Sequence, residues 1–368
     1  MNAKTIWTLL KETFSEWSED KASRLAASLA YYTVFSIAPL LIIVIAVAGL
    51  VFGREAAQGQ IEAQIQGLIG EESAEFVQTL IEASSNKTTG TVAAVIGIAT
   101  LLFGATGLFG QLQDALNTIW EVTPKPGRGV MGIIKDRFFS FTMVLGIGFL
   151  LMVSLVISAA LATFNEFLGN LLGDITIVGE ILNFIISFGV ITLLFAMIYK
   201  ILPDVEIAWS DVWMGAAVTA LLFSLGKFLI GLYIGHSAIA SSFGAAGALA
   251  VILIWVYYSA QILLLGAEFT QSYAKRFGSH IVPDEDAVAV TEEARAQQGM
   301  PRTEAVEEAA QSQERQVARP TATNRQHPAH PATSPVQQRP KYMFPAILVG
   351  LLVNLFSDAL HGSRRKET

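Results

Sequence analysis

The residues of this chain that could do chemistry are ionisable side chains set inside long apolar stretches. Lys227 lies in the stretch that begins at Trp209, and Glu180 lies in the stretch that begins at Ile175. With a rise of about 1.5 Å per helical residue, the two side chains are expected at a similar depth from the same end of a helix bundle. A charge at that depth is costly, so it indicates either a buried ion pair or a substrate or proton site. The ion pair is the favoured interpretation, and a substrate or proton site remains the alternative.

Two more polar residues lie in the last apolar stretch. Glu268 lies within about one helical turn of the inner end of that stretch, and Gln261 lies between about two and three turns from it. At that depth Glu268 is expected within reach of Arg24 or Lys200. A structural ion pair is again the favoured interpretation for Glu268.

Sequence motifs for catalysis are missing. The chain has no Cys, which excludes disulfides, thiolate zinc sites and Cys nucleophiles. Of the five His, only His236 lies near an apolar stretch rather than in or beside the C-terminal tail. The patterns H-E-x-x-H, G-x-S-x-G and G-x-x-x-x-G-K-[ST] do not occur. We therefore expect no catalytic residue, no metal site and no cofactor, and we do not expect an enzyme.

The elements that position these residues are predicted to be transmembrane helices. Of the 368 residues, 52% are apolar and 15% are charged, whereas soluble proteins carry about 25% charged residues. Six stretches are long enough, at roughly 20 residues each, to cross an apolar core about 30 Å thick as helices. They are Ser28–Phe52, Thr91–Gly110, Phe138–Phe164, Ile175–Ile201, Trp209–Gly235 and Gly244–Thr270. The predicted fold class is all-α, a polytopic membrane protein with a six-helix transmembrane bundle.

The Lys and Arg residues near the ends of these spans predict the orientation, because such residues gather on the cytoplasmic side. One side carries only Arg54 and Lys87. The other side carries eleven: Lys4, Lys11, Lys21, Arg24, Lys125, Arg128, Lys135, Arg137, Lys200, Lys275 and Arg276. Both termini are therefore expected in the cytoplasm.

Two segments outside the spans have amphipathic patterns. Residues 1–27 are predicted to form an amphipathic helix at the membrane interface, because four apolar residues share one face: Trp7, Leu10, Phe14 and Trp17. Residues 54–90 contain two apolar runs separated at Gly70. We expect this segment to form an outer helical cap over the membrane domain, residues 28–278.

The C-terminal part has a different composition. From Pro283 to Lys341 the chain has seven of its twelve Pro and no Leu, Ile, Phe, Tyr or Trp. Such a segment has no means of building a core, so residues 279–341 are predicted to be a disordered cytoplasmic tail. Residues 342–368 are apolar with a basic end. They are predicted to lie as a helix in the cytoplasmic interface, because a seventh span would carry that basic end outward.

Several motifs, in order along roughly residues 5–278, resemble the YihY/virulence factor BrkB family. They are Ala26-Ala27-Ser28-Leu29-Ala30-Tyr31-Tyr32-Thr33 with Ser36 and Pro39, Leu116-Asn117-Thr118-Ile119-Trp120, Leu202-Pro203 to Trp209 with Asp211 and Gly215-Ala216, and Trp255-Val256-Tyr257-Tyr258 to Gly266-Ala267-Glu268. Lys227, Tyr233 and Phe243-Gly244 also fall where the family pattern has them. The resemblance implies a bacterial inner-membrane protein with six helices and no settled molecular function. The family was once labelled ribonuclease BN, a label that the missing catalytic residues contradict.

The sequence predicts that the protein binds or moves a small solute or lipid through the helix bundle. The candidate substrate or ion-pair residues are Lys227, Glu180, Glu268, Gln261, Asn117, Tyr31 and Pro39. The alternative is a membrane-organising or scaffold protein without a transport cycle. Membrane lipids and a small solute are the expected partners, and the small residues on helix faces leave a homo-oligomer open. Nucleic acid is not expected, because the net charge is −7 and no long basic run precedes the tail.

Overall fold

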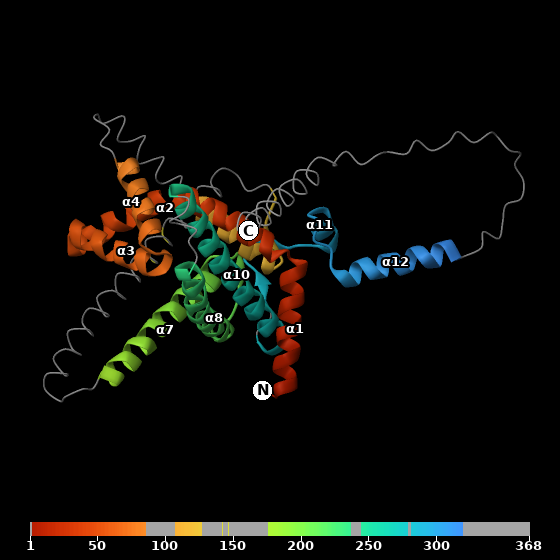
Figure 1. The fold of residues 1–368 in the computed structure, drawn as a ribbon. Helices are drawn as coiled ribbons and strands as arrows, with labels where there is room; N and C mark the ends of the chain where they lie inside the picture. The colour runs from red at the N-terminus through yellow and green to blue at the C-terminus, as the bar shows by residue number, and fades with distance from the viewer. Residues whose placement is uncertain are drawn as a thin grey trace, which may run out of the picture. The chain divides into compact units, whose positions relative to one another are not determined.

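The computed structural model describes residues 2–85, 107–126, 142, 146, 176–236, 244–278 and 281–318, which are mostly helical (Figure 1). The chain divides into two units, Met1–Gln311 and Ser312–Thr368. Of the second unit only residues 312–318 are described, and they are the end of a helix.

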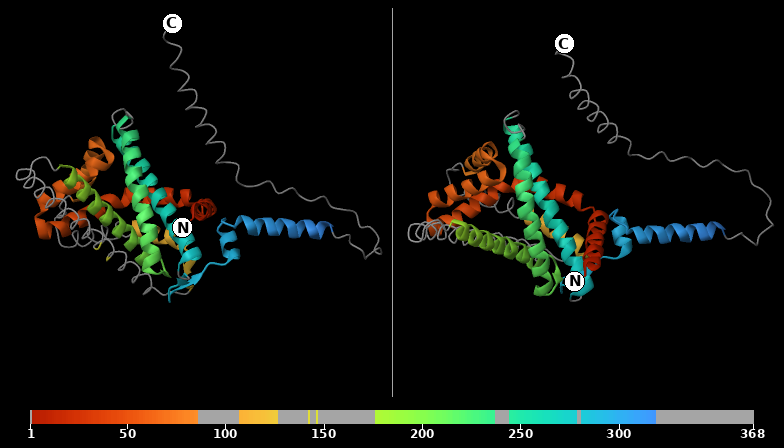
Figure 2. Two further views of the ribbon diagram at one scale, coloured as in Figure 1. Left: turned by 90° about the horizontal axis from the view of Figure 1, so that it is seen from below. Right: turned by 60° about the horizontal axis from the view of Figure 1, so that its bottom comes forward.

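Four long helices form the bundle of the first unit: α2 (Ala22–Phe52), α7 (Thr176–Ile201), α8 (Trp209–His236) and α10 (Ala245–Phe277). Within the described part of the chain, these four are long and apolar enough to cross a membrane. They confirm the first, fourth, fifth and sixth predicted stretches as helices. The second and third, Thr91–Gly110 and Phe138–Phe164, lie largely outside the described residues. Figure 2 shows α8 and α10 running side by side.

The N-terminal segment is two helices rather than one amphipathic helix over residues 1–27. Helix α1 (Ala3–Glu19) ends just before Lys21, which has a left-handed φ of 52°, and α2 begins at Ala22 rather than at Ser28. One face of α1, which includes Leu9 at 1% exposure, is buried, and α1 packs along α10. The opposite face leaves Trp7 71% and Phe14 63% exposed. An exposed apolar face of this kind fits the prediction of a helix at a membrane surface.

Helices α3 (Arg54–Ile69) and α4 (Glu71–Ser85) occupy the segment predicted as an outer cap. Gly53 and Gly70 have φ values of 83° and 82°, a conformation that glycine adopts without steric cost, so one helix ends and the next begins at once. Val77 of α4 packs with Val251 and Ile252 near the start of α10. The two helices and the break at Gly70 are confirmed, while their position outside a membrane stays a prediction.

Helices α7, α8 and α10 approach closely where side chains are small. A Cβ atom at Gly215 of α8 would lie 1.7 Å from Thr270 Oγ1 of α10, and one at Gly266 would lie 1.9 Å from Thr219 Oγ1. The Tyr199 hydroxyl of α7 donates to the carbonyl of Leu263 at 2.7 Å and lies 3.0 Å from Thr219 Oγ1. Close packing of this kind stabilises helix contacts in membranes, where lipid removes the hydrophobic driving force.

The segment after α10 is folded over residues 281–318, which corrects the predicted disorder of residues 279–341 in that range. Strand β3 (Val282–Pro283) pairs with β2 (Val205–Glu206), and β4 (Ala287–Ala289) pairs with β1 (Val122–Pro124), both antiparallel. Helices α11 (Glu292–Gln297) and α12 (Thr303–Ala318) follow.

The reason for the correction is that this polar segment does not need its own apolar core. Its two strands form backbone hydrogen bonds with two loops of the bundle, and it buries Ala287, Arg295 and Met300 at 4%, 2% and 5% exposure. Residues 319–341 and 342–368, the rest of the predicted tail and the predicted interfacial helix, lie outside the described residues.

Candidate functional site

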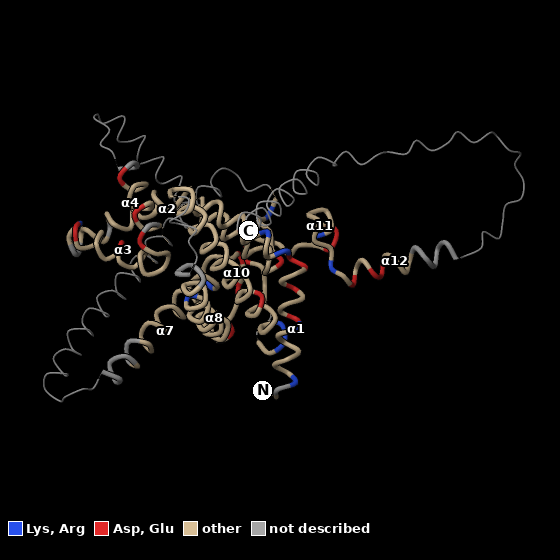
Figure 3. The backbone as a smooth tube through the Cα atoms, in the orientation of Figure 1, with Lys and Arg blue, Asp and Glu red and all other residues tan. Residues whose placement is uncertain are grey.

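Charged residues gather where α1, the end of α10 and the segment after α10 meet, whereas α7 and α8 carry few (Figure 3). We call six of them the ion-pair cluster: Asp20, Glu121, Lys275, Glu292, Arg295 and Arg302. They come from the α1–α2 turn, the turn before β1, α10, and residues 281–302.

The centre of the ion-pair cluster is buried. Arg295 Nη2 lies 2.6 Å from Asp20 Oδ1, and their side chains are 3% and 1% exposed. Arg302 donates to Glu121 Oε1, while Lys275 Nζ lies 3.2 Å from the same oxygen. The cluster therefore ties together parts of the chain that are far apart in sequence.

A turn at Glu121 and the capped start of α11 position the side chains of the ion-pair cluster. Glu121 follows helix 107–119 with a left-handed φ of 57°, which turns the chain into β1. Thr291 caps α11, since its hydroxyl accepts a hydrogen bond from the Ala294 N–H at 3.3 Å. The cap starts the short helix that carries Arg295 toward Asp20.

The electrostatics of the two acids at the centre differ. Burial raises the pKa of Asp20 from 3.8 to about 6, although Arg295 opposes that shift. Burial also acts to raise the pKa of Glu121, but Lys275 and Arg302 outweigh it and the pKa is lowered. Glu121 is therefore a stable anion that anchors two cations. Asp20, with a pKa of about 6, changes its protonation state close to neutral pH.

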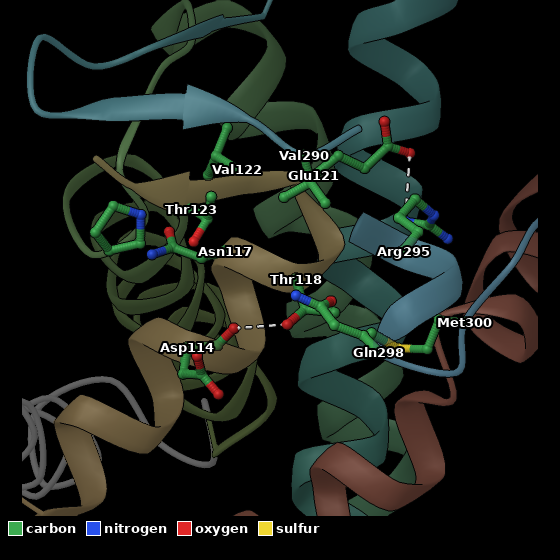
Figure 4. Close-up of a pocket in the computed structure, with 11 residues that line it drawn as sticks. Asp114, Asn117, Thr118, Glu121, Val122, Thr123, Val290, Arg295, Gln298 and Met300 are labelled. Carbon is green, nitrogen blue, oxygen red and sulfur yellow. Dashed lines mark hydrogen bonds and ion pairs between the residues drawn. The ribbon is translucent and has the colours of Figure 1, made fainter. Parts of the chain in front are cut away.

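A small polar pocket adjoins the cluster between helix 107–119 and α11 (Figure 4). Its volume is about 60 Å³, and Asp114, Glu121 and Arg295 contribute its charged lining. Sites for metabolites and drug-sized ligands measure about 300–1,000 Å³, so this pocket has room only for a few water molecules or a small ion. Among the described residues no group of three His, Cys, Asp or Glu is placed to hold a metal ion.

Glu268 does not form the predicted pair with Arg24 or Lys200. The Glu268 side chain is 0% exposed, and neither of its carboxyl oxygens has a hydrogen-bond partner in the part of the chain that the structure describes. Lys200 Nζ instead donates to the carbonyl of Ile207 at 2.5 Å, and Arg24 is exposed. Lys200 is turned away because it closes the loop that follows α7.

Lys227 lines a larger pocket between α3 and α8. The pocket measures about 540 Å³, and among the described residues Lys227 is the one charged residue of its lining; the others are Gly67, Leu68, Ser224, Phe228, Gly231 and Leu232. Lys227 is exposed rather than enclosed within the bundle. The Glu180 side chain lies outside the described residues, so the predicted pairing of Lys227 with Glu180 stays a prediction.

Asn117 has a structural position. Its Nδ2 donates to Asp204 Oδ2 at 2.9 Å, and its Oδ1 accepts from the Asp204 N–H at 2.8 Å. Gln113 Nε2 donates to the other Asp204 oxygen at 3.1 Å. These bonds hold helix 107–119 against the loop after α7. Asn117 thereby fixes the helix that lines one side of the small polar pocket.

The remaining predicted site residues lie apart from both pockets. Tyr31 is 60% exposed on α2, with its ring 4.9 Å from that of Phe35. Pro39 is half-buried inside α2, which continues as a helix on both sides of it. Gln261 is half-buried on α10, and its Oε1 has no hydrogen-bond partner among the described residues.

Sequence reasoning missed the ion-pair cluster. Asp20 and Arg295 are 275 positions apart, and neither belongs to a motif of local spacing. Arg295 stands in a segment whose composition is typical of disorder. The one local signal is Thr291 ahead of Glu292 and Glu293, an N-cap followed by acids in a first helical turn.

Four long helices that are apolar enough to cross a membrane are typical of a multi-pass membrane protein. The chain matches the family Virulence factor BrkB over residues 13–290 and belongs to that family. A UPF0761 membrane protein of Tolumonas auensis is 31% identical over 262 residues, which cover 68% of this chain and 80% of that protein. Its name states no activity.

Two other relatives carry the same kind of name. A UPF0761 membrane protein of Acinetobacter baylyi is 26% identical over 277 residues, 74% of this chain and 62% of that protein. One of Pseudomonas aeruginosa is 28% identical over 253 residues, 67% of this chain and 58% of that protein. The chain thus spans less than two thirds of the length of these two relatives. No solved structure matches the chain.

Proposed function

We propose that this protein binds or moves a small solute or lipid through its helix bundle, and that an anionic group of the ligand meets Lys227. The observation that carries the proposal is the pocket of about 540 Å³ between α3 and α8 with Lys227 in its lining. That volume falls in the range of about 300–1,000 Å³ typical of small-molecule sites. The protein acts in this proposal as a carrier and not as an enzyme.

The chemistry of the lining favours a ligand with one anionic and one apolar part. Lys227 supplies a cation within a helix that can span a membrane, where ionisable side chains commonly mark a pathway for substrates or ions. Leu68, Phe228 and Leu232 supply apolar surface beside it. A headgroup or carboxylate would pair with the ammonium, while a chain or ring would lie on the apolar side chains.

The positions of the helix ends support six crossings with both termini on one side. Four helix ends adjoin the ion-pair cluster or the loops that pair with β3 and β4. They are the start of α2, the end of helix 107–119, the end of α7 and the end of α10. Helix α4 packs instead near the start of α10, at the opposite end. The two remaining crossings of this proposal are the ones that the sequence predicts at Thr91–Gly110 and Phe138–Phe164, which lie largely outside the described residues.

The Lys and Arg bias places the ion-pair cluster on the cytoplasmic side in this proposal. The bacterial inner membrane is the proposed location, since that is where the family resemblance implies such proteins reside.

The test uses full-length protein in proteoliposomes that are shocked osmotically with a panel of anionic, neutral and cationic solutes. Recovery of the light-scattering signal measures solute entry. We expect recovery with an anionic solute to be lost in Lys227→Ala and kept in Lys227→Arg, which retains the charge. Leu225→Ala is the control, because Leu225 is 55% exposed on the same helix but does not line the pocket.

Lipid bound to the purified variants, measured by mass spectrometry, tests the lipid form of the proposal. Anionic lipid should be depleted in Lys227→Ala relative to Lys227→Arg and Leu225→Ala. If folded Lys227→Ala matches the wild-type protein in both assays, the proposed function is wrong.

The scaffold alternative has one observation in its favour, which is that α12 is exposed from Val306 to Ser312. An exposed helix surface is available for contact with another protein. Deleting residues 303–368 distinguishes the two functions, because it removes α12 and the tail without removing residues 281–302, which are part of the fold. A carrier should keep its solute entry after that deletion, whereas a scaffold without a transport cycle should show no solute entry in either protein.

A further inference from the structure

The Glu268 carboxyl is the one acid in the described part of the chain that is fully buried and has both oxygens without a hydrogen-bond partner. An ionised carboxylate without partners is strongly unfavourable in a protein interior, because burial removes the water that solvates the charge. Such a group therefore needs a cation beside it or a bound proton. The surroundings of Glu268 distinguish these two cases.

The charged groups around Glu268 are mostly acids. Those whose charges act on it are Glu16 of α1, Asp20 of the α1–α2 turn, Glu121 of the turn before β1, and Lys275 of its own helix. Three of these four are carboxylates, so the local field adds to the disadvantage of a negative charge at Glu268.

The cations in this region already have partners. Lys275 lies 3.2 Å from Glu121, Arg295 lies 2.6 Å from Asp20, and Arg302 donates to Glu121. From the neighbouring helix α7, Lys200 donates to the carbonyl of Ile207. None of these four cations forms a bond to Glu268 in the described residues.

A bound metal ion does not fit the geometry. A cation cage needs several oxygen ligands around one point, and no group of three His, Cys, Asp or Glu is placed to form one among the described residues. Gln271 lies one helical turn away, but its Nε2 donates to the carbonyl of Ile119 at 2.6 Å, which fixes the amide toward helix 107–119. A proton needs only the carboxyl itself.

We propose that Glu268 is a proton-binding site of this protein, with the carboxyl protonated at neutral pH and enclosed between α1 and α10 beside the ion-pair cluster. This inference goes beyond the proposed function and holds without it, because it concerns proton binding and not transport. If the protein is a carrier, the same site is the natural place for a coupling proton, since its charge would change next to the buried Asp20–Arg295 pair.

The test is the infrared absorption of the protonated carboxyl, recorded on full-length protein at about pH 7. A protonated acid absorbs at a carbonyl frequency that a carboxylate lacks. We expect a band equivalent to one buried carboxyl that disappears in Glu268→Gln and persists in Glu75→Gln. Glu75 is a matched control, because it is an exposed acid of α4.

Stability gives a second and independent measurement. Glutamine has the size and the neutral charge of a protonated glutamic acid, so Glu268→Gln should fold and keep its unfolding midpoint at about pH 7. If Glu268 were instead an anion paired with a cation, the amide would leave that cation unpaired and lower the midpoint.

Three results would overturn the proposal. The first is a Glu268→Gln spectrum identical to that of the wild-type protein, which would show that the acid is ionised. The second is a Glu268→Gln variant that fails to fold or loses stability while Glu75→Gln does not. The third is loss of the wild-type band when sodium or potassium chloride is added at constant pH, because a metal cation would then occupy the site.

Discussion

The Arg295→Met substitution removes the cation that faces the buried Asp20 carboxyl and leaves an unbranched, uncharged side chain in place of the aliphatic part of the arginine. In the wild-type protein the two side chains are 2.6 Å apart and only 3% and 1% exposed. Removal of one partner from a buried ion pair costs about 3–5 kcal/mol, because the remaining charge is left unpaired. Arg295 belongs to the segment that folds back on the bundle, so this cost should appear as undocking of residues 281–302. The ratio of docked to undocked segment is expected to fall by about 100-fold or more.

Hydrogen–deuterium exchange measures that ratio directly. In the docked segment the Val290 N–H donates to the carbonyl of Glu121 at 2.8 Å, and the Asp286 carbonyl accepts from the Lys125 N–H at 3.0 Å. Amides of this segment should exchange about 100-fold faster or more in Arg295→Met, because exchange follows the opening equilibrium. Peptides from α7 and α8 should keep their protection.

The defect should depend on pH with a definite sign. The pKa of Asp20 is raised from 3.8 to about 6, so between these values the folded state binds the proton more readily than the unfolded state. The contribution of Asp20 to the free energy of unfolding therefore falls as the pH rises through that range. In Arg295→Met the unpaired acid is neutralised by lowering the pH. The ratio of the exchange rate in Arg295→Met to that in the wild-type protein should therefore diminish from about pH 7 to about pH 5.

Arg276→Met is the matched control. Arg276 lies 2.8 Å from Glu12, but these side chains are 37% and 48% exposed, and exposed pairs contribute at most about 1 kcal/mol. Unchanged exchange of residues 281–302 in Arg295→Met, or equal effects of the two substitutions, would refute the reasoning about burial.

Two further substitutions test the packing around the site, with thermal unfolding in detergent as the measurement. Asn117→Ala removes two hydrogen bonds to Asp204 and leaves the Asp204 N–H unpaired. The free energy of unfolding should therefore fall by about 1–3 kcal/mol. An unchanged unfolding midpoint would contradict the role given to Asn117. Gly266→Ala places a methyl group 1.9 Å from Thr219 Oγ1 and should cost about 1–3 kcal/mol. Gly189→Ala has no atom within 4 Å of the new methyl group and should cost nothing; similar losses in the two glycine variants would refute the close approach.

The parts of the fold that follow from local physics were predictable from the sequence. Length and apolar composition select helices for α2, α7, α8 and α10, because a membrane core satisfies no backbone hydrogen bonds. Gly70 separates α3 from α4 because glycine adopts a positive φ without cost. Motifs such as the one around Asn117 were sufficient for the family, which the match over residues 13–290 confirms.

Contacts between distant residues were decided only by the tertiary structure. Residues 281–302 have the composition of a tail, yet they fold because β1 and β2 offer backbone partners and Asp20 offers a carboxylate to Arg295. Depth along a helix suggested a cation near Glu268, but depth does not specify which face a side chain occupies. Lys200 turned to a backbone carbonyl, and Glu268 was left among other acids. Sequence periodicity thus determined the helices of this protein, whereas the rotation and packing of those helices determined which charges are paired.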